Sequence, residues 1–114
     1  MNRKVVRVRV ARSLWGRARG LILRPPLPCS VALHLTPCWC IHTGFMRGSL
    51  DLVFLDEGHT VLRIVEALKP WRIAGHARAR SVLEFNAGEA HRQGLRCGDR
   101  LALVCDGEFR HAAA

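Results

Sequence analysis

Five side chains between residues 42 and 51 could act together in chemistry. They are His42, Thr43, Met46, Arg47 and Asp51. The imidazole of His42 exchanges protons near neutral pH, and the guanidinium of Arg47 is a planar donor fork that suits an anion. The apolar run 52–55 that follows is typical of a strand buried on both faces. We therefore predict that the polar residues lie where a loop enters the core, at the mouth of a pocket for a small polar or anionic ligand.

The carboxylate of Asp51 has two alternative roles. It could belong to the ligand site, or it could pair with Arg47 or accept the backbone N–H groups of the bend. An enzyme remains the rival class of protein, with His42 as general base and Asp51 orienting it. We expect Asp51 to matter more for folding than for chemistry.

A metal site is a weaker alternative in the same stretch. Cys38, Cys40 and His42 alternate, so in a strand they would project to one face, and Cys29 could add a fourth ligand. Structural zinc sites usually use C-x-x-C rather than this C-x-C spacing. A catalytic pair of Cys40 and His42 is disfavoured because alternate side chains in a strand lie about 7 Å apart. We favour thiols that act as small hydrophobes, and we predict no metal and no cofactor.

The positive charge lies in the first half of the chain. The net charge is +9, and residues 1–50 contain nine Lys or Arg and no acid. Such a segment could attract nucleic acid or an anionic surface. Seven of these nine residues would make the contacts: Arg3, Lys4, Arg7, Arg9, Arg12, Arg17 and Arg19. Only Trp15 lies near them for base stacking, so we rank this hypothesis third and do not expect nucleic acid as the partner.

Length and cysteine content set the class of the protein. A chain of 114 residues is predicted to form a single domain over residues 1–114. Five cysteines are an odd number without the spacing of a secreted scaffold, which favours a reducing compartment. The sequence contains no signal-like apolar segment and no run of about 20 apolar residues. We expect a cytoplasmic, bacterial protein without a membrane span.

Short alternating runs dominate the secondary-structure pattern. Strands are predicted over 4–10, 31–35, 50–55, 60–66, 81–86 and 100–105, with short helices over 13–22 and 87–93. Residues 72–79 are predicted to be an exposed basic loop. The fold class is therefore α+β and mainly β, with about seven strands in a small antiparallel, barrel-like sheet and one or two short helices.

The order of motifs resembles one known family. Ile-His-Thr at 41–43, Met-Arg at 46–47, Leu-Asp at 50–51 and Val-Phe-Leu-Asp at 53–56 closely resemble the signature of domain of unknown function family 192. The resemblance continues over about four-fifths of the chain. Its other motifs are Gly20-Leu21, Arg24, Pro70, Val82-Leu83-Glu84, Ala87-Gly88, Gly94-Leu95 and Gly98-Asp99.

What the resemblance implies is a fold and a set of site residues. It implies a compact β-rich fold and carries over onto His42, Thr43, Met46, Arg47 and Asp51. The family has no established activity. Some relatives are encoded near pilus or secretion machinery, so the resemblance implies an accessory role and an association with such machinery. The chain departs from the family at Gly44, Gly48 and Ser49, where apolar or aromatic residues and a proline are commoner, so a pocket wall is expected to be missing.

Overall fold

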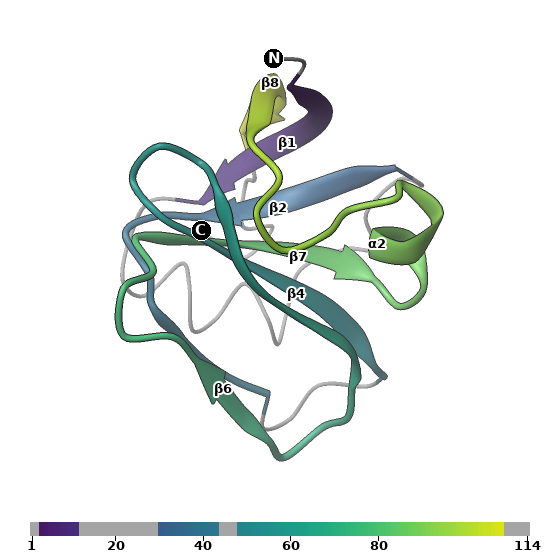
Figure 1. Ribbon diagram of the computed structural model, residues 1–114. Coiled ribbons are helices and arrows are strands. Elements are labelled where there is room, and N and C mark those ends of the chain that lie inside the picture. Colours follow the sequence, from purple (N-terminus) through teal and green to yellow (C-terminus); the bar gives the residue numbers. More distant parts are fainter. Residues whose placement is uncertain (1–2, 12–29, 44–47, 109–114) are drawn as a thin grey trace.

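A computed structural model describes residues 3–11, 30–43 and 48–108 of the chain (Figure 1). These residues form a six-stranded sheet with the order β5-β4-β7-β2-β1-β8 and a separate two-stranded ribbon, β3-β6. The elements are β1 Lys4–Ala11, β2 Val31–Leu35, β3 Cys40–His42, β4 Leu50–Leu55, β5 Val61–Leu68, β6 Ile73–Gly75, β7 Ser81–Asn86, α2 Glu89–Arg92 and β8 Leu101–Glu108.

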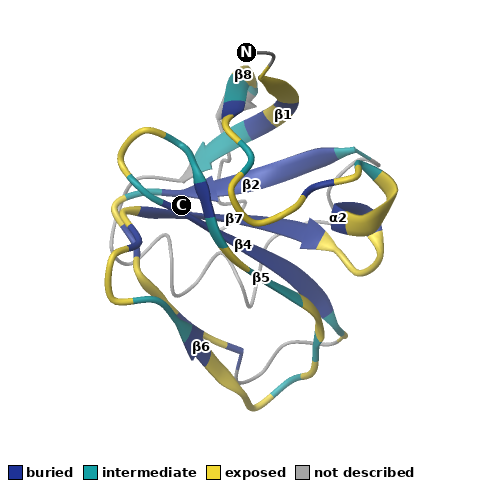
Figure 2. Cartoon of the chain, in the orientation of Figure 1, coloured by how far each residue is buried: buried dark blue, intermediate teal, exposed yellow. Residues whose placement is uncertain are grey.

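Burial along each strand follows its place in the sheet. All the residues of β2 and of β4 are buried, as expected for central strands with both faces covered. In β1, Val6 and Val8 are buried while Val5 and Arg7 are exposed, which is the alternation of a half-buried strand. Figure 2 shows this difference, with buried residues concentrated on β2, β4 and β7.

Two apolar clusters lie on opposite faces of the sheet. Leu50, Leu52 and Phe54 of β4 belong to the first cluster, and the alternate residues Val53 and Leu55 belong to the second. The β3-β6 ribbon contributes Ile41 and Ala74 to the first cluster, and α2 contributes Ala90 to the second. The ribbon and α2 therefore cover different faces of the sheet (Figure 1).

The mainly β class is confirmed, but the predicted antiparallel barrel is wrong. β1 runs parallel to both of its neighbours, β2 and β8. The sheet is open, because β5 and β8 are its two edges and are not paired with each other. The residues just before these strands, Thr60 and Arg100, form an isolated bridge. Parallel neighbours need long crossover connections, and residues 12–30 separate β1 from β2. Alternation within one strand carries no information on the direction of its neighbour.

Most predicted elements are present with shifted ends. Strands at all six predicted places are confirmed, and the second predicted helix is reduced to α2. The predicted basic loop 72–79 is corrected, since it contains β6, which pairs with β3. The close approach of this ribbon depends on Gly75, where a Cβ would lie 2.9 Å from the carbonyl oxygen of Trp39. The predicted helix over 13–22 lies outside the described residues.

Candidate functional site

The Asp51 carboxylate is fully buried and bonded to three backbone N–H groups. Its Oδ1 accepts from Ala67 at 2.8 Å, and its Oδ2 accepts from Gly88 at 2.9 Å and from Ala90 at 3.0 Å. Of the two partners predicted for a structural role, Arg47 or the backbone of the bend, the described residues show backbone N–H donors. The donors differ from those expected, because they lie 16 to 39 residues away rather than in the bend.

These donors are groups that regular structure leaves unpaired. Between the pairs Leu50–Leu68 and Leu52–Val65, β5 contains one residue more than β4, so a bulge lies opposite Asp51. The two other donors lie at the start of α2, where the N-cap makes no side-chain hydrogen bond of its own. Asp51 therefore acts as a remote cap for α2 and as the acceptor for the β5 bulge.

Thr43 is also fully buried and fastens a turn to β3. Its hydroxyl oxygen accepts from the N–H of Arg72 at 2.8 Å, and it lies 2.8 Å from the carbonyl oxygen of Lys69 and 3.0 Å from that of Arg72. A hydroxyl has one hydrogen, so it donates to one of the two carbonyl groups at a time. Thr43 therefore shapes the ribbon from within.

His42 lies on the outer face of the ribbon. It is exposed and is the cross-strand partner of Ile73, whose side chain is 68% exposed. Because Asp51 alternates with β4 residues that pack against the ribbon, its side chain points to the opposite face of the six-stranded sheet. The structure thus exposes His42, buries its neighbour Thr43 and keeps Asp51 apart from His42. Met46 and Arg47 lie outside the described residues.

The separation of the two residues weakens the enzyme alternative. An orienting carboxylate must accept a hydrogen bond from the imidazole that acts as base. Asp51 instead accepts from Ala67, Gly88 and Ala90. His42 and Asp51 therefore do not form the base and orienting acid of the rival hypothesis.

The three side chains of the metal alternative do not converge on one point. Cys40 and His42 are exposed on one face of β3, whereas Cys38 precedes the strand and is buried in the first apolar cluster. Its thiol lies 3.4 Å from the carbonyl oxygen of Cys40. Within the part of the chain that the structure describes, no group of three or more His, Cys, Asp or Glu is placed to hold a metal ion. Cys29 lies outside that part.

The basic residues of β1 are paired with acids from the end of the chain. Lys4 bonds to Asp99 at 2.7 Å, and Arg7 and Arg9 lie 2.6 and 3.6 Å from the carboxylate of Asp106. The hydrogen bond from Lys4, then that from the backbone of Arg96, lowers the pKa of Asp99. The hydrogen bond from Arg7 lowers the pKa of Asp106 in the same way. Arg12, Arg17 and Arg19 lie outside the described residues.

A second basic surface includes the segment 72–79, which the sequence predicted to be an exposed basic loop. Residues 69–80 contain no acid, and Lys69, Arg72, Arg78 and Arg80 are all exposed. None of these four cations forms an ion pair with another described residue. Trp71 is 60% exposed in the same segment, and Trp39 beside β3 is also exposed. The sequence signal for this surface is a run without acidic residues that contains an aromatic residue. Comparing the net charge of the two halves of the chain does not reveal this run.

A contact between two histidines, one of them buried, lies outside these surfaces. The rings of His34 on β2 and His59 in the β4-β5 turn meet edge to face, with centroids 5.7 Å apart. His34 is buried, and its Nε2 has no hydrogen-bond partner among the described residues. Burial, followed by the charge of His59, lowers the pKa of His34 to about 4. His34 is therefore neutral at pH 7.

No helix within the described ranges has the length and apolar character needed to cross a membrane.

Comparisons with known proteins place the chain among uncharacterised relatives. A model of domain of unknown function 192 (DUF192), described as "Uncharacterized ACR", matches residues 1–103. A UPF0127 protein of Pyrococcus horikoshii is 37% identical over 89 residues, covering 71% of this chain and 73% of that one. A UPF0127 protein of Pyrococcus abyssi is 32% identical over 106 residues, covering 86% of each chain.

Two solved structures resemble the fold. A protein of unknown function from Novosphingobium aromaticivorans has a TM-score of 0.72 at 25% identity, covering 82% of this chain and 71% of that one. A structure from Sinorhizobium meliloti, described as a candidate transcription regulator, has the same TM-score and identity and covers 82% of this chain and 78% of its own. The two Pyrococcus relatives are archaeal, so the bacterial origin expected from the sequence stays a prediction.

Proposed function

This chain belongs to the DUF192 family, and we propose that it is a small accessory protein that binds a polar or anionic ligand on the outer face of the β3-β6 ribbon. The observation behind this proposal is the exposed pair of His42 and Ile73 beside the acid-free segment 69–80. An imidazole beside exposed apolar surface and unpaired cations offers hydrogen bonds, contact area and positive charge together.

The side chains around this pair have distinct parts in the proposal. His42 supplies the hydrogen-bonding group, and Trp71 and Ile73 supply contact area. Arg72 adds a cation at the same end of the ribbon, and its backbone is fixed by Thr43. Thr43 therefore supports the site without contacting the ligand.

The other predicted site residues have different roles in the proposal. Met46 and Arg47 follow β3 in the sequence and remain candidate ligand contacts. Asp51 is assigned to folding because its oxygens are engaged with backbone groups on the other face of the sheet. An association with pilus or secretion machinery is the partner that the family resemblance favours.

The experiment is a thermal-shift screen with a panel of small anions that includes inorganic phosphate, sugar phosphates and dicarboxylates. A compound that stabilises the wild-type protein is then measured by calorimetry against His42→Ala and Trp71→Ala. The matched control is His91→Ala, an exposed histidine on α2. We expect binding to weaken about tenfold or more in the two ribbon variants and to persist in the control. Binding that survives both ribbon variants would overturn the proposal.

A second candidate function is binding of single-stranded nucleic acid on the same surface. Exposed Trp39 and Trp71 beside unpaired cations are the combination that such proteins use for base stacking and backbone contact. The description of the Sinorhizobium meliloti structure favours testing it. Binding of a thymidine oligonucleotide should then weaken steeply with salt and in the double variant R78Q/R80Q. A flat salt response rules this function out.

A further inference from the structure

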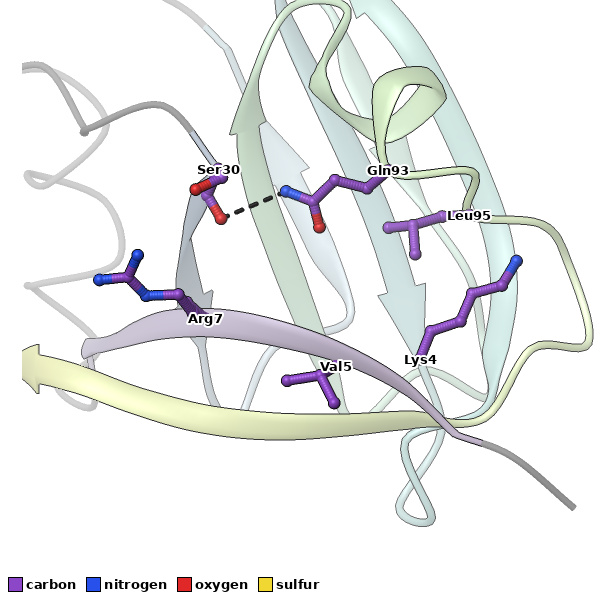
Figure 3. Close-up of a pocket in the computed structure, with 6 residues that line it drawn as sticks. All are labelled: Lys4, Val5, Arg7, Ser30, Gln93 and Leu95. Carbon is purple, nitrogen blue, oxygen red and sulfur yellow. Dashed lines mark hydrogen bonds between the residues drawn. The ribbon is translucent and has the colours of Figure 1, made fainter.

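An open cavity of about 300 Å³ lies between β1 and the turn after α2 (Figure 3). It is at the lower end of the range for small-molecule sites. Its lining combines apolar, amide and cationic side chains, contributed by Lys4, Val5, Arg7, Ser30, Gln93 and Leu95. None of these residues belongs to the ribbon surface, so the cavity is a separate candidate site, which we call the β1-α2 pocket.

Gln93 presents a fixed acceptor to this pocket. Its Nε2 donates to the carbonyl oxygen of Ser30 at 3.2 Å and to the carboxylate of Glu89 at 3.0 Å. Both amide hydrogens are then used, which sets the orientation of the amide. Its Oε1 accepts no hydrogen bond from the described residues and points toward the side of Val5 (Figure 3). A ligand in this pocket therefore needs a hydrogen-bond donor.

Two cations on β1 flank Val5, with their side chains leaving the strand in opposite directions (Figure 3). Arg7 gives Nη2 to Asp106, which leaves other N–H groups of its guanidinium for a ligand. Lys4 donates to the carbonyl of Gly94 and to Asp99. A ligand therefore also needs an acceptor, and a carboxylate matches the guanidinium fork.

Both cations that line the pocket already have a carboxylate partner. Lys4 is paired with Asp99, and Arg7 is paired with Asp106. A multiply charged anion such as a phosphate ester would gain little from cations that are already paired. A zwitterion adds no net charge and can use the donors and the acceptor at once.

The floor of the pocket is apolar. Val5 is 65% exposed, whereas Leu95 is already buried in the second apolar cluster. Covering the side chain of Val5 would remove apolar surface from water, which favours a ligand with an apolar group.

We propose that the β1-α2 pocket binds a free α-amino acid with an apolar side chain. The α-carboxylate accepts hydrogen bonds from the guanidinium of Arg7, and the α-ammonium group donates to Oε1 of Gln93. The apolar side chain of the ligand covers Val5. The proposal is independent of the ribbon surface, because it uses different residues.

Isothermal titration calorimetry with L-leucine and L-phenylalanine at pH 7 tests this site. Two analogues of leucine each lack one charge: 4-methylpentanoate has no ammonium group, and isoamylamine has no carboxylate. We expect at least one amino acid to bind and its charge-deleted analogues to bind about tenfold more weakly or worse. The absence of binding by both amino acids up to about 10 mM would overturn the proposal.

Two variants test the assigned contacts. Arg7→Met should weaken amino-acid binding about tenfold, while Arg9→Met should not, although both residues lie beside Asp106. Gln93→Met removes the acceptor at similar length and should weaken L-leucine more than 4-methylpentanoate. Circular dichroism melts confirm that each variant is folded, and the Gln93 comparison stands if Arg7→Met unfolds. Equal binding by wild type and both pocket variants contradicts the proposal.

Discussion

Asp51 on β4 accepts the backbone N–H of Ala67 on β5 at 2.8 Å, where β5 contains one extra residue. Ala67 has φ of 51°, in the left-handed region that only some residues adopt readily. The same carboxylate bonds to Gly88 and Ala90 through its other oxygen. One side chain therefore holds a bulge in an edge strand and the start of α2 in register with the centre of the sheet.

The first prediction is that Asp51→Ala destabilises the protein by about 2 to 4 kcal/mol, because buried N–H groups lose their acceptor. Asp51→Asn should cost less. Its amide oxygen still accepts hydrogen bonds in place of one carboxylate oxygen, whereas its NH₂ group faces an N–H donor in place of the other. Urea unfolding of both variants measures the change in the free energy of unfolding. If Asp51→Ala has the same free energy of unfolding as the wild type but loses ligand binding, Asp51 is a binding residue and the structural assignment is wrong.

The example of Asp51 shows what the sequence could predict. Its position between a polar loop and a continuously apolar strand was enough to predict a buried carboxylate that needs a partner, either Arg47 or backbone N–H groups. The identity of those donors could not be predicted, because Gly88 and Ala90 come close only after β7 has paired with β4. The local sequence pattern predicts that the carboxylate needs hydrogen-bond partners, and the order of the strands in the sheet determines which residues these are.

The same limit explains the error in topology. Alternation in residues 4–10 predicted β1, but not that it lies parallel to β8 at the other end of the chain. That pairing also brings Asp99 and Asp106 to Lys4 and Arg7, and the net charge of each half of the chain could not show that these cations are paired. β6 was missed because it has only three residues and depends on β3 for its hydrogen bonds.

The second prediction concerns the hydroxyl of Thr43. Thr43→Val keeps the shape of the side chain but leaves the N–H of Arg72 without its side-chain acceptor, and it should cost about 1 to 2 kcal/mol. Thr43→Ser keeps the hydroxyl and should recover much of this loss. Hydrogen exchange at Arg72 should accelerate in Thr43→Val and not in Thr43→Ser. Equal exchange in the two variants would show that the hydroxyl does not hold the turn.

The third prediction is a loss of stability in mild acid through His34. Burial lowers the pKa of His34 from 6.5 to about 4 in the folded protein. Between these values the unfolded state binds more protons, so stability falls as the pH falls. The loss of stability is absent above about pH 6.5 and reaches at most about 3 kcal/mol near pH 4.

His34→Phe should flatten this part of the curve of unfolding free energy against pH, because it removes the titrating group. The control His91→Ala changes an exposed histidine and should leave the slope between these pH values as in the wild type. Urea unfolding at several pH values gives the slope. An unchanged slope in His34→Phe would assign the acid sensitivity to another group.

The last prediction concerns the close approach of the two ribbon strands at Gly75. A Cβ there would lie 2.9 Å from the carbonyl oxygen of Trp39 and 3.4 Å from Cα of Cys40, so the contact can be relieved only by moving backbone. Gly75→Ala should therefore cost about 1 to 3 kcal/mol and should separate β3 from β6. Gly48→Ala is the matched control, because a Cβ at Gly48 meets no atom within 4 Å.

The two glycine variants also test whether the ribbon must be intact for binding. If the outer face of β3 and β6 receives the ligand, Gly75→Ala should weaken a compound found in the anion screen even under conditions where the variant remains folded. The pairing of His42 with Ile73 is lost when the strands separate, although neither side chain is changed. Amino-acid binding in the β1-α2 pocket should persist, since that pocket contains no ribbon residue. If Gly75→Ala is as stable as Gly48→Ala and binds the anion as tightly as the wild type, the close backbone contact in the ribbon is unimportant for both folding and binding.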